Sequence, residues 1–336
     1  MAGAEERRLL KSQGATASLP ESVRNRLVAG RQRVVVFGAT GWLGMVALDL
    51  LESALGPELD RQVSAWASRE RVVELRSGHK VAVGDLRDAG AADVDGALVL
   101  HFAFLTRDRV AEVGVDEFLR ANRAITHHVL STLGAASPVG LVYTSSGAVY
   151  APGGGYATDL ADNPYGAAKR LDEIALRAAC SDVGASCVIP RVFSVSGPYM
   201  TKPELYALGD LIRQADRDDA LRIRATRPVY RSYIAAGDLV SICITAALSG
   251  EREVVFDSGG DIVEVGALAD LVRIDAGRPE MPIERQWDPE AEADRYVADQ
   301  AAVSDLARRF GIPLQSLPDQ VAETAADLHE SEGERT

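Results

Sequence analysis

The chain has 336 residues, 47% of them apolar and 25% charged, the balance of a globular protein that can bury one large core or two joined ones. Its formal net charge of −13 argues against nucleic acid as a partner, because phosphate backbones attract basic surfaces. The longest apolar runs are only strand-length and no secretory signal is recognisable, so we expect no membrane association. Cys180, Cys187 and Cys243 are scattered without metal-ligand spacing, which indicates buried thiols in a reducing cytoplasm and no metal site.

Strand-length apolar segments alternate with helical stretches through most of the chain. Before them, residues 1–30 form an N-terminal extension in which we expect a short surface helix near residues 21–27. The alternation predicts parallel strands with helices on both faces, a doubly wound α/β fold. The expected strands cover residues 33–38, 61–67, 79–83, 97–103, 141–143, 186–192 and 253–257.

A glycine-rich segment follows the first predicted strand. Gly38-Ala-Thr-Gly41-Trp-Leu-Gly44 leads into an apolar stretch with helical periodicity, and strand, glycine turn and helix in that order is the dinucleotide-binding arrangement. Gly38 permits the tight turn, Gly41 lets the backbone approach a pyrophosphate, and Gly44 lets the helix pack closely on the strand. The helix N-terminus offers free N–H groups to the phosphates. We therefore expect cofactor contacts from Gly38, Thr40, Gly41, Trp42, Leu43 and Gly44.

Three polar residues downstream predict the chemistry. Tyr165 and Lys169 stand one helical turn apart, and Ser146 lies upstream in Thr144-Ser-Ser-Gly-Ala-Val-Tyr150. A phenol titrates near pH ~10, and an ammonium on the same helical face stabilises the phenolate and lowers that pKa. A nearby serine hydroxyl can hydrogen-bond a substrate oxygen as its charge changes. Together the three predict a carbonyl/alcohol interconversion in which Tyr165 moves the proton, Ser146 polarises the oxygen and a nicotinamide moves the hydride.

These motifs and several others, in the same order, resemble the extended short-chain dehydrogenase/reductases, specifically their NAD(P)-dependent nucleotide-sugar epimerase/dehydratase branch. The resemblance runs from about residue 33 to about residue 317. Residues 84–88 resemble the segment whose Asp-Leu contacts adenine, and residues 101–105 resemble the strand end beneath the nicotinamide ribose. Residues 191–198 resemble the segment where the cofactor and substrate domains meet. Residues 231–239 resemble the element whose arginine binds a substrate diphosphate.

The resemblance also implies a division into domains and a set of contacts. It implies an NAD(P)-binding Rossmann domain of residues 31–193 plus about 233–260, and a smaller C-terminal α/β substrate domain of about 194–232 plus 261–325. We expect residues 326–336 to form a frayed tail. The implied cofactor contacts include Asp85, Leu86, Phe102, Ala103, Asn122, Tyr165, Lys169 and Val192. The implied substrate contacts are Ser145, Ser146, Ser194, Arg231 and Arg295.

The end of the second predicted strand bears on the choice of cofactor. NAD-preferring enzymes usually place an acidic residue there to hold the ribose 2′-hydroxyl. This chain has Ser68 and Arg69 instead, with no carboxylate before Glu70. A guanidinium suits a 2′-phosphate, so we predict contacts from Ser68 and Arg69 and a preference for NADP, with NAD possible.

The residues after the catalytic serine bear on the reaction. Sugar dehydratases of this family carry an acidic residue there, whereas here Gly147 and Ala148 follow, which argues against dehydration. The main prediction is a cytoplasmic, homodimeric ketoreductase acting on a nucleotide-diphosphate sugar. The alternatives are a nucleotide-sugar epimerase with a retained cofactor, a reductase of a small non-sugar ketone, and a non-catalytic dinucleotide-binding protein.

Overall fold

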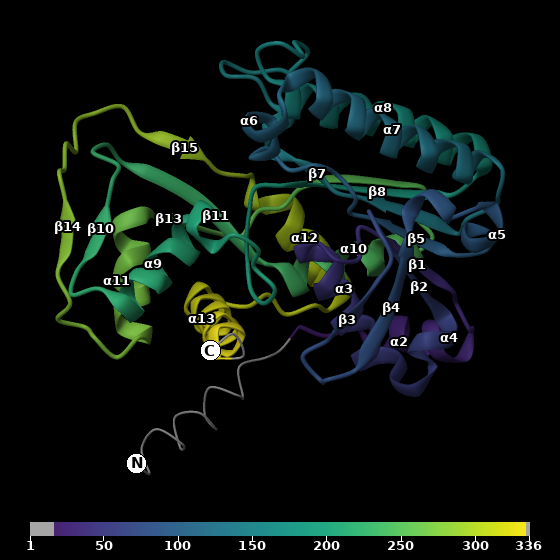
Figure 1. Cartoon of the computed structure of the whole chain (residues 1–336), viewed down its shortest axis with the longest axis horizontal. Coiled ribbons are helices and arrows are strands. Elements are labelled where there is room, and N and C mark those ends of the chain that lie inside the picture. Colours follow the sequence, from purple (N-terminus) through teal and green to yellow (C-terminus); the bar gives the residue numbers. More distant parts are fainter. Residues whose placement is uncertain (1–16, 334–336) are drawn as a thin grey trace.

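The large sheet runs β12-β8-β6-β5-β1-β2-β4-β3, with β7 beside β8, as Figure 1 shows in part. The structure is a computed structural model that describes residues 17–333. Among the described strands of this sheet, neighbours are parallel except β3 and β4, which confirms the predicted doubly wound fold. The strands are β1 (Val34–Phe37), β2 (Val63–Ala67), β3 (Arg71–Glu74), β4 (Lys80–Asp85), β5 (Leu98–His101), β6 (Gly140–Tyr143), β7 (Ser145–Ser146), β8 (Ser186–Val192) and β12 (Glu253–Asp257).

Helices cover both faces of this sheet, which explains why its central strands are continuously apolar. Val34 and Val36 of β1 belong to a core shared with α3 and α10, whereas Val35 and Phe37 belong to one shared with α7 and α8. The helices around the sheet are α2 (Glu21–Ala29), α3 (Trp42–Leu55), α4 (Leu59–Gln62), α5 (Ala91–Val94), α6 (Arg109–Val113), α7 (Val115–Gly134), α8 (Pro164–Val183), α10 (Ala236–Leu248) and α12 (Gln300–Phe310). Helix α2 matches the helix expected near residues 21–27.

A smaller lobe lies to one side of the large sheet (Figure 1). Strands β13, β11 and β15 form its main sheet with β9 beside β11, and β10 pairs with β14. Its core contains Leu211, Leu268 and Val321 from three helices. Its elements are β9 (Ser194–Ser196), α9 (Ala207–Arg217), β10 (Leu221–Ile223), β11 (Val229–Ala235), β13 (Asp261–Glu264), α11 (Val265–Asp275), β14 (Ile283–Arg285), β15 (Asp294–Tyr296) and α13 (Leu317–Gly333).

Two expectations about the C-terminal part are wrong. Helix α12 falls within the range assigned to the substrate domain, but Val303 and Leu306 are buried in the core of the large sheet. The tail expected to fray from residue 326 continues α13 to Gly333, because Leu328 is buried in the core of the small lobe. Residues 334–336 of that range lie outside the described part of the chain.

Two further features concern the molecule as a whole. Cys180, Cys187 and Cys243 are buried free thiols, as expected. Within residues 17–333, each helix is too short or too polar to cross a bilayer.

Candidate active site

The glycine turn after β1 lies in close contact with the backbone of the segment after β5. Gly38 has a φ of +85°, and a Cβ there would lie 2.5 Å from the backbone nitrogen of Ala103. A Cβ on Gly44 would lie 2.2 Å from the carbonyl oxygen of Gly38. Only glycine fits either position without movement of the backbone. The turn therefore begins α3 directly at the carboxyl end of β1, with its first N–H groups facing away from the strand.

A cavity of about 610 Å³ opens beside this turn, at the carboxyl ends of β1, β2, β4 and β5. This is where ligands bind in doubly wound sheets. The predicted cofactor residues that line it are Gly38, Thr40, Gly41, Ser68, Asp85, Leu86, Phe102 and Ala103. Lining residues that the sequence reasoning missed include Arg87, Phe104, Leu105, Thr106, Arg109 and His128.

The cavity and the turn together fit a dinucleotide. The glycine backbone and the first turn of α3 would hold the pyrophosphate, since Gly38, Thr40 and Gly41 line the cavity directly before that helix. Asp85 and Leu86 lie at the end of β4, and Phe102 and Ala103 follow β5. An elongated ligand would therefore contact different residues at its two ends. Arg87, Phe104 and Leu105 lie within the segments 84–88 and 101–105 that resemble the family, but were not singled out there. Thr106, Arg109 and His128 lie outside those segments.

Eight predicted cofactor residues do not line this cavity. Trp42 instead packs its ring 5.4 Å from that of Tyr206, and Asn122 accepts a hydrogen bond of 2.7 Å from the backbone nitrogen of Leu105. Asn122 thus supports the loop after β5, a position from which it can shape the cavity only indirectly. Arg69 is exposed beyond the cavity wall. The other five are Leu43, Gly44, Val192, Tyr165 and Lys169.

Ser146 and Tyr165 come together where β7 faces the first turn of α8. Asn163 caps that turn by accepting a hydrogen bond of 2.9 Å from the nitrogen of Gly166, and donates one of 3.0 Å to the carbonyl of Ala148. The start of α8 is therefore tied to the segment that carries the serine. Burial raises the pKa of the Tyr165 phenol well above its usual value, and a hydrogen bond with Ser146 opposes this only in part.

Lys169 lies one turn further along α8 and is 4% exposed. Its Nζ donates a hydrogen bond of 2.6 Å to the carbonyl of Thr144 and lies 3.8 Å from the ring centroid of Phe104. Burial lowers the pKa of Lys169 to about 7, whereas the charges of Asp172 and Glu173 act to raise it. The sequence predicts an ammonium that lowers the pKa of the Tyr165 phenol. In the structure burial raises that pKa, the opposing influences are Ser146 and Arg107, and the ammonium of Lys169 bonds to backbone.

A second phenol, which sequence reasoning did not assign, joins this site from the small lobe. The hydroxyl of Tyr296 on β15 lies 3.3 Å from the Oγ of Ser146 and 3.5 Å from the carbonyl of Val192. Its ring packs 4.8 Å from that of Phe193. Ser194, a predicted substrate contact, is half-buried on strand β9, which pairs with β11. The alternation in Asp294-Arg295-Tyr296 was the available signal, but it does not say which residue faces the serine.

The register of β11 and β15 separates the two arginines predicted to bind substrate. Arg231 pairs with Tyr296, and Tyr230 pairs with Arg295. Paired residues share a face of a sheet and successive residues alternate, so Arg231 faces the catalytic side and Arg295 the opposite side. The guanidinium of Arg295 lies 4.4 Å from the ring centroid of Tyr230 and is exposed.

Arg231 is the better placed of the two. Its side chain is 27% exposed and pairs with Asp294 at 3.2 Å. It lines a second cavity of about 260 Å³, together with Leu205, Val229 and Tyr233 among others. Because this cavity lies on the face that carries Tyr296, Arg231 can meet an anionic group of a ligand that reaches the catalytic serine.

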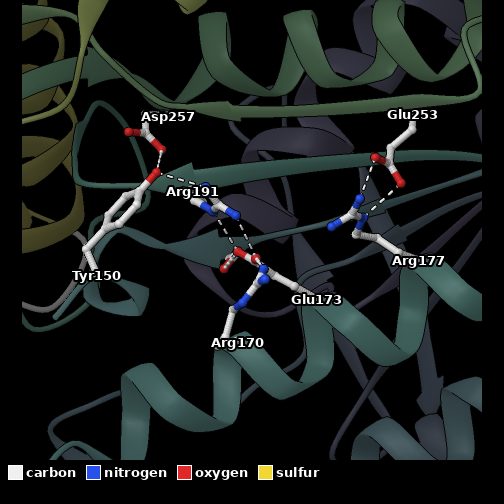
Figure 2. Close-up of polar contacts among 8 residues, drawn as sticks. Tyr150, Arg170, Glu173, Arg177, Arg191, Glu253 and Asp257 are labelled. Atoms are coloured by element: carbon white, nitrogen blue, oxygen red, sulfur yellow. Dashed lines mark hydrogen bonds and ion pairs between the residues drawn. The ribbon is translucent and has the colours of Figure 1, made fainter. Parts of the chain in front are cut away.

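Ser145, also predicted to contact substrate, bonds instead to Glu173, part of a buried polar network. Its Oγ donates a hydrogen bond of 2.6 Å to Glu173. Arg191 donates two hydrogen bonds of 2.9 Å each to the same carboxylate (Figure 2). Arg191 also donates to the hydroxyl of Tyr150, which donates to Asp257, each at 2.8 Å. Burial would raise the pKa of Glu173, but bonds from Arg191 and Ser145 among others hold it below its usual value. The network fixes Ser145 of β7, whereas the next hydroxyl, that of Ser146, lies beside Tyr165 and Tyr296.

Comparisons with known proteins agree with this geometry. UDP-glucose 4-epimerase of Azospirillum brasilense is 31% identical over 180 residues, which are 50% of this chain and 51% of that enzyme, so the match spans about half the length of the relative. The structure of UDP-N-acetylglucosamine 4-epimerase from Methanobrevibacter ruminantium M1 superposes with a TM-score of 0.69 at 18% identity, covering 89% of this chain and 99% of that one. DesIV, a dTDP-glucose 4,6-dehydratase from Streptomyces venezuelae solved with NAD bound, gives 0.68 at 21% identity, covering 90% and 98%. The sequence profile described as the NAD dependent epimerase/dehydratase family matches residues 34–266, and the chain belongs to that family.

Proposed function

We propose that this protein transfers a hydride between a bound nicotinamide and a secondary alcohol or carbonyl of a nucleotide-diphosphate sugar. The observation that carries the proposal is the meeting of Ser146, Tyr165 and Tyr296 at the junction of the two lobes, beside a cavity suited to a dinucleotide. Arg231 on the same side offers a guanidinium to a diphosphate. Solved proteins of this fold carry UDP-glucose or UDP-glucuronic acid together with NAD, which supports the substrate class.

The protonation states of the site suit this chemistry. A bound nicotinamide supplies the hydride acceptor or donor. Since burial keeps Tyr165 protonated at neutral pH, its phenol can donate a proton to the oxygen of a carbonyl that is being reduced. Ser146 can hydrogen-bond that oxygen as its charge changes. In the oxidative direction the phenol must first lose its proton, and an ammonium at Lys169 favours that loss electrostatically.

Within this chemistry the relatives favour epimerisation, in which one carbon is oxidised and then reduced while the cofactor stays bound. Dehydration is disfavoured because Gly147 and Ala148 follow Ser146, where sugar dehydratases of this family carry an acidic side chain. The ring of Phe193 lies beside Gly147, 2.7 Å from where a Cβ would stand. The nearby carboxylates of Glu173 and Asp257 are engaged by Arg191 and Tyr150.

The cofactor cavity supports a second candidate, a ketoreductase that uses NADPH. Ser68 at the end of β2 lines the cavity where an NAD-binding enzyme usually presents a carboxylate. Arg87, which also lines it, is 83% exposed and can leave its partner Asp85 to meet a 2′-phosphate. Cells keep the NADP pool reduced, which favours a reductive step with release of the oxidised cofactor.

Product analysis with a panel of nucleotide sugars separates these candidates. An epimerase forms the isomeric sugar with no net change in the nicotinamide, whereas a ketoreductase oxidises one NADPH for each product formed. Reduction of a small neutral ketone alone would contradict the proposed substrate class. Tight dinucleotide binding without turnover on the full panel, including simple ketones, would contradict an enzymatic role.

We also propose a cytoplasmic homodimer. Three buried free thiols suit a reducing compartment. Leu171 and Ile174 of α8 are 55% and 52% exposed and lie three residues apart on one face of the helix, which suits burial against a second copy. Sedimentation of wild type and of the Leu171→Glu/Ile174→Glu double variant tests this: the dimer should dissociate in the variant. A monomeric wild type would contradict the proposal.

A further inference from the structure

Two adjacent acidic residues of α8 are buried, yet their partners differ. Glu173 is gripped by two guanidiniums, those of Arg170 at 2.6 Å and Arg191 at 2.9 Å (Figure 2). Asp172 is 9% exposed and its Oδ2 accepts hydrogen bonds only from hydroxyls, 2.8 Å from Thr126 and 3.0 Å from Tyr143. Within residues 17–333, it forms no direct ion pair. A buried carboxylate without a cation is costly, so its charge needs another source of compensation.

The nearest source is the catalytic lysine, one helical turn earlier on α8. The Nζ of Lys169 lies 4.7 Å from the ring centroid of Tyr143, whose hydroxyl bonds to Asp172. The ammonium and the carboxylate therefore contact the same tyrosine, the first at its ring and the second at its hydroxyl. With both charged side chains buried, little water screens their attraction.

The other titratable groups around the lysine are neutral or already paired. From β5 comes His101, whose pKa burial lowers to about 3, so its imidazole is uncharged at neutral pH. From β6 comes Tyr143, whose pKa burial raises well above its usual value. On α8 itself, Tyr165 is protonated and the charge of Glu173 is balanced by its arginines. From α7, the described contact is the uncharged hydroxyl of Thr126.

We propose that Asp172 is a positioning residue for the reaction, a buried counter-ion that keeps Lys169 in its ammonium form beside Tyr143. The proposal rests on the proposed function for its catalytic consequence, because the ammonium is what favours ionisation of the Tyr165 phenol. The influences on the pKa of Lys169 agree with this geometry. Burial lowers the pKa of Lys169 to about 7, and the charge of Asp172 is the largest influence in the opposite direction. Near neutral pH, therefore, this carboxylate contributes more than Glu173 to how much of the lysine is protonated.

The composition of the chain makes a direct test simple, since Lys11, Lys80, Lys169 and Lys202 are its four lysines. NMR titration of full-length protein labelled with ¹³C at lysine Cε reports the pKa of each, and Lys169→Arg assigns the signal of interest. Asp172→Asn keeps oxygen acceptors for both hydroxyls but removes the charge. Its Lys169 pKa should fall by about one unit or more relative to wild type. Asp172→Glu, which retains the charge, should restore most of the difference.

The matched control is Asp182→Asn, which removes the same charge from an exposed position near the end of the same helix. It should leave the Lys169 titration unchanged. Asp172→Ser offers a second uncharged side chain if the asparagine variant does not fold. An unchanged Lys169 pKa in whichever uncharged variant folds would overturn the proposal, as would an equal shift in the control.

A second measurement concerns catalysis and separates this inference from the proposed function. With an active substrate, the pH above which kcat declines should move down in Asp172→Asn by the same amount as the lysine pKa. A lower kcat with an unmoved pH profile would indicate a structural role only and overturn the positioning role. If no nucleotide sugar is turned over, the proposed function fails. The NMR titration still shows whether the charge of Asp172 raises the pKa of Lys169.

Discussion

Burial sets the protonation of single residues at the catalytic site. It acts in opposite directions on acids and cations, because in both cases it disfavours the charged form. The pKa of Tyr165 rises above its usual value and the pKa of Lys169 falls to about 7, so both groups are poised toward their neutral forms. The charge that the reaction needs must come from the few ionised groups that remain nearby.

The first prediction concerns Tyr165, whose phenol would exchange the proton. Tyr165→Phe should lower kcat at least a hundredfold, the scale of a general acid–base group, with little change in dinucleotide affinity. Tyr156→Phe is the matched control, since that phenol is 41% exposed and away from the serine. Steady-state kinetics and cofactor titration measure both effects. Near-normal turnover in Tyr165→Phe would remove this residue from the mechanism.

The second prediction uses the two arginines on opposite faces of the small sheet. Charge-assisted hydrogen bonds to a diphosphate are worth about 1.5–3 kcal/mol each, so Arg231→Ala should raise the substrate KM roughly ten- to a hundredfold. Arg295→Ala should have little effect, because its guanidinium lies over Tyr230 on the other face. Equal effects of the two substitutions on KM would show that substrate does not meet the face carrying Tyr296.

At the scale of elements, strand ends and helix starts build the cofactor site. The glycine turn places the first turn of α3 at the end of β1, and the turns after β2 and β4 bring Ser68 and Arg87 to one cavity. None of these contacts depends on the small lobe. Cofactor affinity and substrate affinity should therefore respond to different substitutions.

The third prediction tests the packing of α3 on β1. Gly44→Ala would place a Cβ 2.2 Å from a backbone oxygen, so it should lower Tm and weaken dinucleotide binding. Gly134→Ala is its control, because a Cβ there meets nothing within 4 Å at the end of α7. That variant should be neutral or slightly more stable, since alanine favours helix by about 1 kcal/mol over glycine. Thermal unfolding compares the two, and equal Tm values would refute the close approach.

The fourth prediction concerns the choice of cofactor. Arg87→Ala should weaken NADP far more than NAD, because only NADP has a 2′-phosphate for a guanidinium to bind. Arg69→Ala should change the preference less, since Arg69 lies outside the cavity wall. Titration of both cofactors into the three proteins measures this. A wild type that prefers NAD, or an Arg87 variant with unchanged preference, would reject the proposed NADP site.

At the scale of the whole molecule, the C-terminal segment joins the two lobes. Helix α12 packs on the large sheet, and α13 packs on the small one. Between them, the backbone nitrogen of Gln315 donates a hydrogen bond of 2.7 Å to Asp238 of α10, which is 1% exposed. This bond ties the segment before α13 to α10, a helix that packs on the large sheet.

The fifth prediction follows from the burial of Asp238, which raises its pKa from 3.8 to about 6. A carboxyl with a raised folded pKa stabilises the fold at low pH and loses that contribution as pH rises from about 4 through 6. Asp238→Asn keeps an acceptor for Gln315 and should raise Tm at pH 7–8 relative to wild type. The gain should shrink below about pH 4. A gain in Tm independent of pH would contradict ionisation as its cause.

The sequence by itself determined the parts of this protein that depend on local order. Strand, glycine turn and helix occur together from β1 to α3, and Tyr165 and Lys169 share a helical face, so neighbours in sequence sufficed to predict them. The same holds for the family, because its motifs are short segments in a set order.

Only the tertiary structure decided which side chains meet across distant elements. Ser145 bonds to Glu173 on α8, and Tyr296 rather than Arg295 faces the catalytic serine, because strand register selects one of two alternating faces. The placement of Arg87 in the cavity and of α12 on the large sheet depends equally on contacts between segments far apart in the chain. A linear pattern does not specify such contacts, since each residue's face is set by partners that lie elsewhere in the sequence.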